Sequence, residues 1–322
     1  MANNMLQLGE GNSRQAFMDV LLEAAKVDEN IIVLTSDATG SAALGKIAAQ
    51  LPAQFVECGI AEQNMVGIAA GIASFGKRPF VCAPAAFLSA RSFEQIKVDV
   101  AYSVNNVKLI GVSGGVSYGA LGETHYSVQD FAAMRAVAGI VVLCPSDPVQ
   151  AASLADILAK SDEPAYLRMG RGNIPIIYDE YKHFKIGKAI ECRTGRDVTI
   201  VATGEQVYQA LCASEQLKKM SISSRVLDMF TVKPIDKAAV VKAAKETGCV
   251  VTVEEHCIHG GLGSAVAQVL GENYPVPLKC LALPNEMLLC GSPAEIKNYY
   301  GINADGIVKA VLDIVCRKKY EC

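Results

Sequence analysis

The stretch FVECGIAEQNMVGIAAGIASFGKRPFVCAPAAF (55–87) decides the fold of this chain. Its middle, MVGIAAGIASFG (65–76), has the small and apolar composition of a buried helix, and RPFVCAP (78–84) is typical of a buried strand. One carboxylate, Glu62, stands early in the stretch, just after the tight entry Gly59-Ile60-Ala61. The stretch therefore predicts a helix at 61–75 with an acid in its first turn, followed by a strand.

Short apolar runs alternate with helical patterns on both sides of this stretch. Apolar strands separated by helices are typical of a parallel sheet covered on both faces. The helix that follows Pro145 has Ser146 or Asp147 as its expected N-cap. Besides 78–84, we expect strands at 31–37, 106–114 and 139–145, and helices at 12–26, 61–75, 91–104, 127–136 and 147–160.

The second half of the chain repeats this alternation after a break. Residues 176–197 are polar, aromatic and less regular, which indicates a linker with an edge strand. Strands are then expected at 198–204, 224–230, 249–256 and 278–284, with helices before residue 219 and at 236–247 and 261–271. A chain of 322 residues is too long for one ordinary core. We expect an α/β fold of two doubly wound, mainly parallel sheet domains, at 1–182 and 183–322.

The composition excludes several classes of protein. The net charge is −3 and no basic stripe stands out, which argues against a nucleic-acid partner. No run of about 20 apolar residues could span a membrane, and the N-terminal residues have no apolar core typical of a secretion signal. The eleven cysteines include no C-x-x-C pair. We therefore expect a cytoplasmic protein with reduced thiols and no metal ligands of its own.

Glu62 has two interpretations from the residues alone. An anion in the first turn of a helix gains about 0.3–1 kcal/mol from the helix dipole, which suits an exposed acid. The helix after Glu62 is apolar all round, however, and a desolvated carboxyl there would have a raised pKa and could share a proton with a ligand nitrogen. The sequence leaves the structural and the functional interpretation equally open.

Ligands of open α/β sheets bind beyond the carboxyl ends of the strands. Asp37 and Ser41 follow the first expected strand, and the glycine-rich segment GVSGGVSYGALGETH (111–125) follows the third. This segment ends in His125, which can act as a general acid or base or bind a hydroxyl group. A flexible surface loop is the alternative.

Several arginines and a second glycine cluster are further candidates for ligand binding. Arg168 and Arg171 follow an expected strand and suit a phosphate or carboxylate, with an interdomain ion pair as an equal alternative. Arg14, taken alone, is an ordinary residue of a helix start. The cluster GGLGS (260–264) lacks the full dinucleotide fingerprint, so we interpret it as packing at a helix start. Nearby His256 and His259 lack a third metal ligand.

Several motifs in a fixed order resemble the transketolase family. They are SRQAF (13–17), IIVLTSDATGS (31–41), the Glu62 stretch, F-x-x-x-R-x-F-E-Q-I (87–96), GETH (122–125) and LRMGRGNIP (167–175). The resemblance covers essentially the whole chain, as a pyrimidine-binding domain followed by the transketolase C-terminal domain. No single motif would suffice, but the ordered set is specific.

The resemblance implies a role for each candidate residue. In the family, the acid equivalent to Glu62 hydrogen-bonds a ring nitrogen of the aminopyrimidine of thiamine diphosphate, which favours the tautomer that removes the proton from the thiazolium carbon. Phe87 matches the aromatic residue that stacks on the pyrimidine, and Asp37 matches an acid near the thiazolium end. His125 matches a histidine that contacts the sugar hydroxyls. The residues that match the group gripping a sugar phosphate are Arg14, Ser41 and Arg171.

The family's diphosphate-binding motif is missing. That motif is GDG followed by an asparagine, which together hold the magnesium ion; the nearest sequence here is ADG at 304–306, in the wrong context. The resemblance therefore implies a split enzyme, in which an N-terminal transketolase subunit with GDG supplies the diphosphate and Mg²⁺ site. The expected assembly is a heterotetramer of two copies of each chain, and the apolar helix after Glu62 is the expected subunit interface.

Three departures from the family concern the substrate. Leu121 stands where many transketolases have an acid that contacts a substrate hydroxyl, Ser113 replaces a histidine, and Pro84 replaces an aromatic residue. Losing a buried hydroxyl partner changes discrimination by orders of magnitude where a site depends on it. We expect transfer of a two-carbon ketol unit from an anionic but non-standard ketose to an aldose.

Other thiamine enzymes and a non-catalytic role are the alternatives. The beta subunit of a 2-oxo-acid dehydrogenase has a similar size and domain order, and the synthase of deoxyxylulose phosphate is a further relative. The motifs GIAEQ (59–63) and GETH fit transketolase better. A non-catalytic regulatory subunit is the alternative from another class, and the intact Glu62 and Phe87 argue against it.

Overall fold

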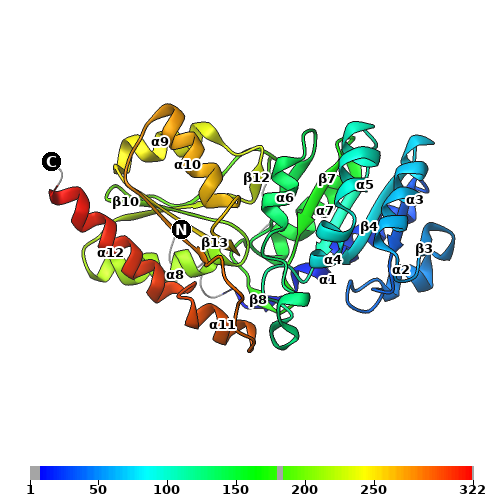
Figure 1. Cartoon of the computed structure of the whole chain (residues 1–322), viewed down its shortest axis with the longest axis horizontal. Helices are drawn as coiled ribbons and strands as arrows, with labels where there is room; N and C mark the ends of the chain where they lie inside the picture. Colours follow the sequence, from blue (N-terminus) through cyan, green and yellow to red (C-terminus); the bar gives the residue numbers. More distant parts are fainter. Residues whose placement is uncertain (1–7, 180–183, 321–322) are drawn as a thin grey trace.

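The first half of the chain forms a seven-stranded sheet, as the computed structural model shows for residues 8–179 and 184–320 (Figure 1). The strand order is β12-β6-β7-β5-β4-β2-β3. All neighbours are parallel except β12, which pairs antiparallel with β6 at one edge. The bounds are β2 (Ile31–Thr35), β3 (Phe55–Glu57), β4 (Arg78–Pro84), β5 (Lys108–Val112), β6 (Val141–Leu143), β7 (Ala165–Arg168) and β12 (Thr231–Lys233).

Helices cover both faces of this sheet, as the alternation of strands and helices predicts. Side chains alternate along β4, so Phe80 and Cys82 face one helix layer while Val81 and Ala83 face the other. The first layer is α1 (Ser13–Val27) and α7 (Pro148–Lys160). The second layer contains α3 (Glu62–Ser74), α4 (Ala85–Arg91), α5 (Phe93–Gln95), a π-helix (Ile96–Tyr102) and α6 (Asp130–Ala136).

Local sequence signals explain several helix starts. Asn12 caps α1 through the N–H of Gln15, and Asp147, one of the two predicted caps, caps α7 through the N–H of Gln150 with Pro148 in the first turn. The predicted helix at 91–104 is wrong in its start and form. The chain turns helical directly after β4, at Ala85, and its last part is a π-helix.

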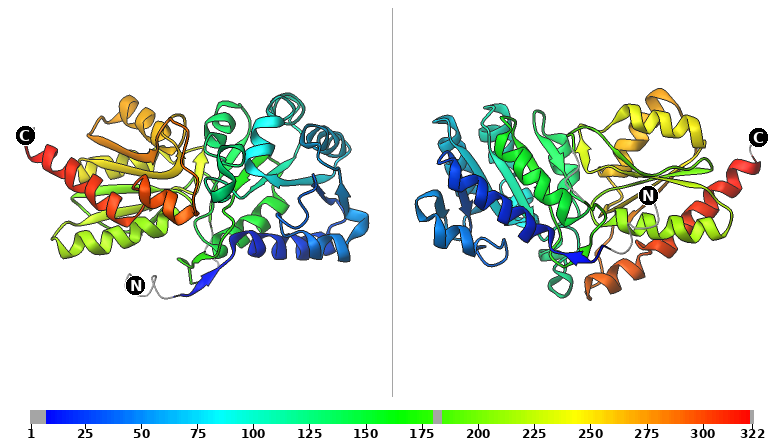
Figure 2. Two further views of the ribbon diagram at one scale, coloured as in Figure 1. Left: turned by 60° about the horizontal axis from the view of Figure 1, so that its bottom comes forward. Right: turned by 180° about the vertical axis from the view of Figure 1, so that it is seen from behind.

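The second half forms a five-stranded sheet in the order β14-β13-β10-β11-β9 (Figure 2). Its strands are β9 (Ile190–Arg193), β10 (Val198–Ala202), β11 (Ser224–Asp228), β13 (Val250–Cys257) and β14 (Leu278–Leu283), with α8 (Gln206–Lys219), α9 (Lys237–Thr247), α10 (Leu262–Asn273), α11 (Pro293–Tyr299) and α12 (Ala304–Tyr320). Only β9 runs antiparallel, at the edge, which confirms the edge strand predicted for the linker. The remaining elements are β1 (Glu10–Gly11), β8 (Ile174–Pro175), α2 (Gly45–Gln50) and 3-10 turns at Pro52–Gln54 and Gly119–Thr124. The α/β class with two mainly parallel sheets is as predicted.

The two sheets meet in a buried polar seam. β12 comes from the second half of the sequence but completes the first sheet. Nearby, the carboxyl of Asp228 accepts hydrogen bonds from Tyr178 (2.7 Å), Ser146 (2.9 Å) and Gln150 (2.9 Å). Burial raises the pKa of Asp228 to about 6. Within the described residues, no helix is long and apolar enough to cross a membrane.

Candidate functional site

Glu62 is a buried carboxylate at the first position of α3. Its side chain is 5% exposed, and the turn before it needs the left-handed backbone of Gly59 (φ 71°). Arg91, at the end of α4, donates from Nη1 to Oε1 (3.0 Å) and Oε2 (3.2 Å) of Glu62. The carboxyl is therefore buried, and Arg91 on the neighbouring helix is its cationic partner among the described residues.

Within this chain, the helix after Glu62 is buried on one face only. Met65, Val66, Ala69 and Ala70 face the sheet. On the outer side, a side chain added at Gly67 or Gly71 would meet no atom within 4 Å. Phe75, which ends the helix, is 89% exposed. One face of α3 is therefore left uncovered within this chain.

A continuous series of contacts joins Glu62 to the glycine-rich loop. The guanidinium of Arg91 lies over the Phe87 ring at 4.0 Å from its centroid. Phe87 packs edge-on against His125 at 5.1 Å, and His125 packs edge-on against Tyr118 at 5.2 Å between ring centroids. The structure thus brings the predicted Glu62, Phe87 and His125 together, although they lie on three different elements.

The three residues expected to hold an anion also lie together. The guanidinium of Arg171 is 5.0 Å from the Tyr118 ring centroid. Arg14 donates a short hydrogen bond to the carbonyl of Ser41 and a longer one (3.5 Å) to the carbonyl of Arg171. Burial, and then the charge of Arg171, lower the pKa of Arg14. Two neighbouring guanidinium groups form a place where an anion is favourable.

Asp37 lies at the same sheet edge, after β2. It has a left-handed backbone (φ 51°), is exposed, and donates its N–H to Oε1 of Glu57 (2.7 Å). Glu57 also accepts from the N–H of Gly59 (3.0 Å) and the hydroxyl of Thr39 (3.3 Å). The carboxylate of Glu57 therefore links the turn at Asp37 to the residues that precede α3 through hydrogen bonds. Sequence reasoning missed Glu57, and its position at the end of a short strand is the signal that could have found it.

Several buried polar atoms at this edge have no partner among the described residues. They are the hydroxyls of Ser13, Ser36 and Ser113 and Nε of Arg14. Ser36 follows β2, Ser113 follows β5, and Ser13 begins α1 beside Arg14. Buried polar atoms are nearly always hydrogen-bonded, so such a group marks a place for a polar ligand or water. Ser113 is fully buried with a left-handed backbone (φ 57°), and Leu121 is 54% exposed near the loop tip.

Other candidates from the sequence have structural roles. Arg168 is buried and pairs with Asp130 of its own domain at 2.9 Å, so its ion pair is not the interdomain one expected; its contact with the second domain is a hydrogen bond to the backbone carbonyl of Glu255 (2.9 Å). The N–H groups of Leu262 and Gly263 donate to Glu254, so the glycines at 260–263 form a helix start, as predicted. His256 is buried and stacks on Phe131 at 5.3 Å. Among the described residues, no cluster of side chains could hold a metal ion.

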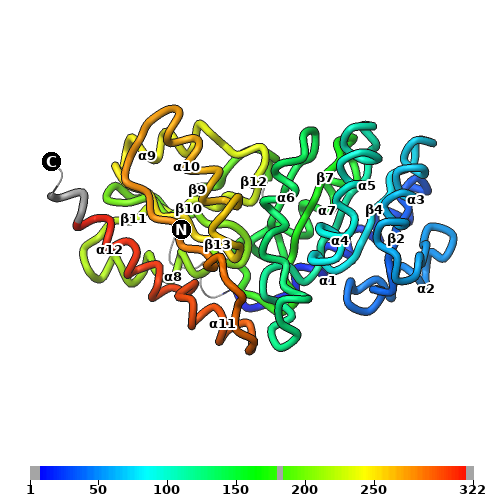
Figure 3. Tube along the Cα trace, viewed as in Figure 1, coloured from blue at the N-terminus to red at the C-terminus, as the bar shows by residue number. Residues whose placement is uncertain are grey.

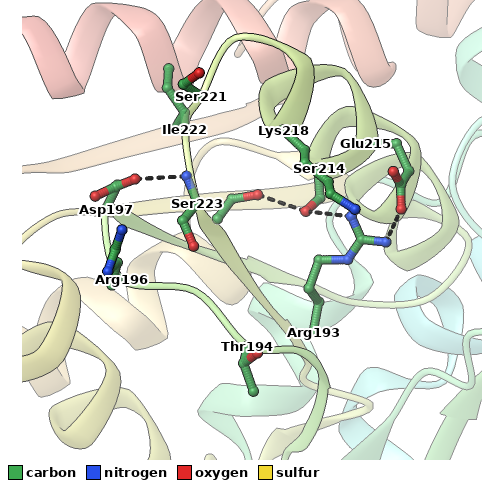
Figure 4. A pocket seen from close by; sticks show the side chains of 11 residues that line it. Arg193, Thr194, Arg196, Asp197, Ser214, Glu215, Lys218, Ser221, Ile222 and Ser223 are labelled. Atoms are coloured by element: carbon green, nitrogen blue, oxygen red, sulfur yellow. Dashed lines mark hydrogen bonds and ion pairs between the residues drawn. The ribbon is translucent and has the colours of Figure 1, made fainter. Parts of the chain in front are cut away.

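Cavities lie on both sides of Arg91. One of about 580 Å³ is lined by residues 60–64 and Arg91, and one of about 300 Å³ by Phe87, Arg91, Thr124 and their neighbours. A third cavity, of about 390 Å³, lies elsewhere, near the amino ends of β10 and β11 (Figure 4). Three of its charged groups are engaged: Arg193 contacts Glu215 and Ser214, and Asp197 accepts from the N–H of Ser223. The first two cavities therefore mark the candidate active site.

Two family models match the chain over most of its length. The transketolase pyrimidine-binding domain matches residues 10–176, and the transketolase C-terminal domain matches residues 187–307. The chain belongs to the transketolase family. This confirms the membership expected from the motifs, and with it the class of the protein, a transferase that depends on thiamine diphosphate.

Similar proteins support the same assignment. The chain is 49% identical over 317 residues to a subunit of the apulose-4-phosphate transketolase of Phocaeicola vulgatus, covering 98% of this chain and 99% of that one. It is 38% identical over 315 residues to the 6-deoxy-6-sulfo-D-fructose transketolase subunit SqwH of a Clostridium species, covering 98% of both. A solved structure described as a split gene transketolase, inactive beta4 tetramer, superposes with a TM-score of 0.88 at 35% identity, covering 95% of this chain and 98% of that one. These relatives favour the transketolase interpretation over a 2-oxo-acid dehydrogenase.

Proposed function

We propose that this chain supplies the pyrimidine-binding and sugar-binding side of a two-chain transketolase, which transfers a two-carbon ketol unit from a ketose to an aldose. One observation carries the proposal: a continuous series of contacts runs from Glu62 through Arg91, Phe87 and His125 toward Arg171. The series joins an acid and an aromatic ring suited to the pyrimidine with cations suited to an anionic sugar. The same chain lacks the GDG motif for the diphosphate.

The residues present fit one end of thiamine diphosphate. Glu62 is a buried carboxylate that can share a proton with a ring nitrogen, and Phe87 is a half-buried ring beside it. Asp37 would lie near the thiazolium end. When bound, the cofactor supplies the stabilised carbanion chemistry, while the protein supplies orientation and electrostatics. His125 is placed to bind or protonate sugar hydroxyls, and Mg²⁺ with the diphosphate is left to the partner chain.

The open face of α3 is the proposed contact with that partner. Large apolar side chains are exposed around it, at Ile60, Phe75, Tyr102 and Val104. The names of the relatives support a second chain, because two are named as subunits and the split-gene structure is described as an inactive tetramer of beta chains. We propose an N-terminal subunit with GDG as the partner, in a heterotetramer of two copies of each chain. We place the boundary between this chain's two domains at residues 182 and 183, within the stretch 180–183 that lies outside the described residues.

The proposed donor is a ketose with an anionic tail. Arg14, Ser41 and Arg171 meet at the sheet edge, where the unpartnered hydroxyls of Ser36 and Ser113 are also found. The two named relatives act on apulose 4-phosphate and on a sulfonated deoxyfructose, and both sugars carry an anion. Leu121 places an apolar side chain near the loop tip where many transketolases have an acid. A deoxy, branched or otherwise modified ketose fits these changes better than an ordinary pentose phosphate.

A donor screen with the assembled enzyme tests this proposal. The chain would be mixed with its GDG-bearing partner, thiamine diphosphate and Mg²⁺, and ketol transfer to an aldose would be measured for ordinary and modified ketose phosphates. We expect transfer, with a modified ketose phosphate as the preferred donor. Turnover of xylulose 5-phosphate as good as that of a typical transketolase would contradict the substrate proposal. An assembled, cofactor-loaded complex without any transfer would favour a regulatory subunit.

We also place the protein in the cytoplasm, because its buried thiols are suited to a reducing compartment. Cys82 and Cys144 are buried in or beside central strands of the first sheet. Burial raises the pKa of Cys144 to about 12, so this thiol stays protonated and unreactive.

A further inference from the structure

The loop that carries His125 is closed at its base. Gly115 and Ser127 pair in both directions: the N–H of Gly115 donates to the carbonyl of Ser127 (3.0 Å), and the N–H of Ser127 donates back (2.9 Å). Between them lie Tyr118, Leu121 and His125. The placement of these three side chains therefore depends on whatever supports residues 115–127, which we call the site loop.

The second domain of the same chain supports the tip of the site loop (Figures 1 and 3). A side chain at Gly119 would come within 2.5 Å of the carbonyl of Gly291, and one at Gly122 within 2.8 Å of Cys290 Sγ. The hydroxyl of Tyr126 donates to the carbonyl of Leu289 (3.2 Å). In addition, the N–H of Leu288 donates to Oε1 of Glu123 (2.7 Å). Residues 288–291 thus form a platform under the loop.

The base of the site loop rests on Glu255, at the end of β13. Its Oε1 accepts the N–H of Val116 at 2.8 Å, and a side chain at Gly115 would come within 2.2 Å of the same oxygen. Glu255 is buried, and a buried carboxylate without a counter-charge is costly. Lys297 of α11 supplies such a charge at the carboxylate, with Nζ 3.5 Å from Glu255 Oε2 and 3.1 Å from Glu205 Oε2, while the buried Arg168 contacts the backbone carbonyl of Glu255. The charge of Glu255, and then that of Glu205, raises the pKa of Lys297.

We infer that Lys297 is a positioning residue for the active site, acting through Glu255 on the site loop. It lies on α11 in the second domain, and its ion-pair partners among the described residues are Glu205 and Glu255. Removing its charge leaves two carboxylates facing each other. Glu255 then gains by turning toward water, which releases the N–H of Val116 and loosens the loop that holds His125 against Phe87. The inference rests on the proposed function for the role of His125.

Kinetics of the assembled two-chain enzyme test the inference. Lys297→Met should raise the KM for the ketose donor about tenfold, because a small displacement of a substrate contact has a large effect, while the Kd for thiamine diphosphate changes less than about twofold. Lys297→Arg, which keeps the charge, should restore most of the loss. Lys309→Met, at an exposed lysine of α12, is the matched control and should behave as the wild type.

A double variant separates positioning from simple loss of stability. Glu255→Gln removes the charge that needs Lys297 but keeps an oxygen for the Val116 N–H. In that background, Lys297→Met should add less than about twofold to the KM, because the two residues act as one unit. Equal effects of Lys297→Met in both backgrounds would overturn the inference, and so would a fall in cofactor affinity parallel to the rise in KM.

Hydrogen exchange gives a readout that does not depend on activity. In Lys297→Met, amides of the site loop should exchange about tenfold faster, while amides of α3 stay unchanged. Unchanged exchange in the loop would overturn the inference. If the wild-type complex shows no ketol transfer, the proposed function fails, but loop exchange still decides whether Lys297 holds the loop.

Discussion

The two halves of the candidate site differ in what covers them. The Glu62 half is built on α3 and α4 against the sheet, and its outer face, with Gly67, Gly71 and Phe75, is open. The His125 half is built on a loop that the chain's own second domain covers, through Glu255 and residues 288–291. Among the described residues, the uncovered side is therefore the Glu62 side. The proposed two-chain enzyme requires this difference, because the partner chain would cover the Glu62 side.

The largest expected effect follows from neutralising the acid of the open half. Glu62→Gln keeps the size of the side chain but removes its capacity to share a proton. In the assembled enzyme, kcat should fall about 10²- to 10⁴-fold, the range for loss of a general acid or base. Glu94→Gln, at an exposed acid of α5, is the control. Wild-type turnover by Glu62→Gln would contradict this expectation, because Glu62 would then have no role as an acid or base in the reaction.

A charge on the open face of α3 should prevent assembly without harming the fold. A Cβ atom added at Gly71 would meet no atom within 4 Å in the single chain, and replacing a helical glycine stabilises a helix by about 0.5–1 kcal/mol. Association with the partner, measured by sedimentation velocity, should weaken about 100-fold, as expected for a charge buried at the centre of an interface. Gly271→Arg on α10 has the same free space and is the matched control. Equal assembly of both variants would show that α3 is not the contact.

The residues proposed to bind an anion in the covered half should act on substrate binding. Arg171→Met should raise the KM for a phosphorylated donor about 10- to 100-fold, the worth of a charge-assisted hydrogen bond, with little change in kcat. The KM for the matching non-phosphorylated sugar should rise much less. Arg196→Met, at an exposed arginine of the second domain, serves as control. A similar loss for both sugars would argue that Arg171 only supports the loop through Tyr118.

The buried seam between the two sheets should have the smallest effect on turnover, and the change expected there is in the stability of the fold. The pKa of Asp228 is about 6 in the folded chain, raised from 3.8, so its contribution to stability is present below pH 4 and is lost as the pH rises through 6. Asp228→Asn does not titrate. The unfolding free energy of the wild type relative to Asp228→Asn should therefore fall by about 1–3 kcal/mol between pH 4 and pH 7. Denaturant titrations at both pH values measure it, with Asp313→Asn as an exposed control. A constant difference would contradict the raised pKa.

Much of the first domain could be predicted from the sequence. Apolar strands such as 78–84 are periodic and bounded by breakers, and Glu62 stands out because charged residues are rare around it. The ordered motifs alone also predict that Phe87, His125 and Arg171 belong to one site. Local patterns suffice where each element carries its own signal.

The contacts between elements could not be predicted in the same way. The F-x-x-x-R motif contains Arg91 but does not predict its contacts. The position of Arg91 between Glu62 and Phe87 depends on how α3 and α4 pack. β12 joins the first sheet from the second half of the chain, which no local pattern indicates. The support of the site loop by Glu255 and Lys297 likewise joins residues more than a hundred positions apart.

The central claim is that the cofactor site is completed on the open side by another chain. Calorimetric titration of thiamine diphosphate with Mg²⁺ into this chain alone, and into its mixture with the GDG-bearing subunit, tests this most directly. We expect binding in the mixture only, and loss of that binding in Glu62→Ala and in Phe87→Ala. Tight binding to the isolated chain would contradict it, because the chain would then hold the diphosphate by itself.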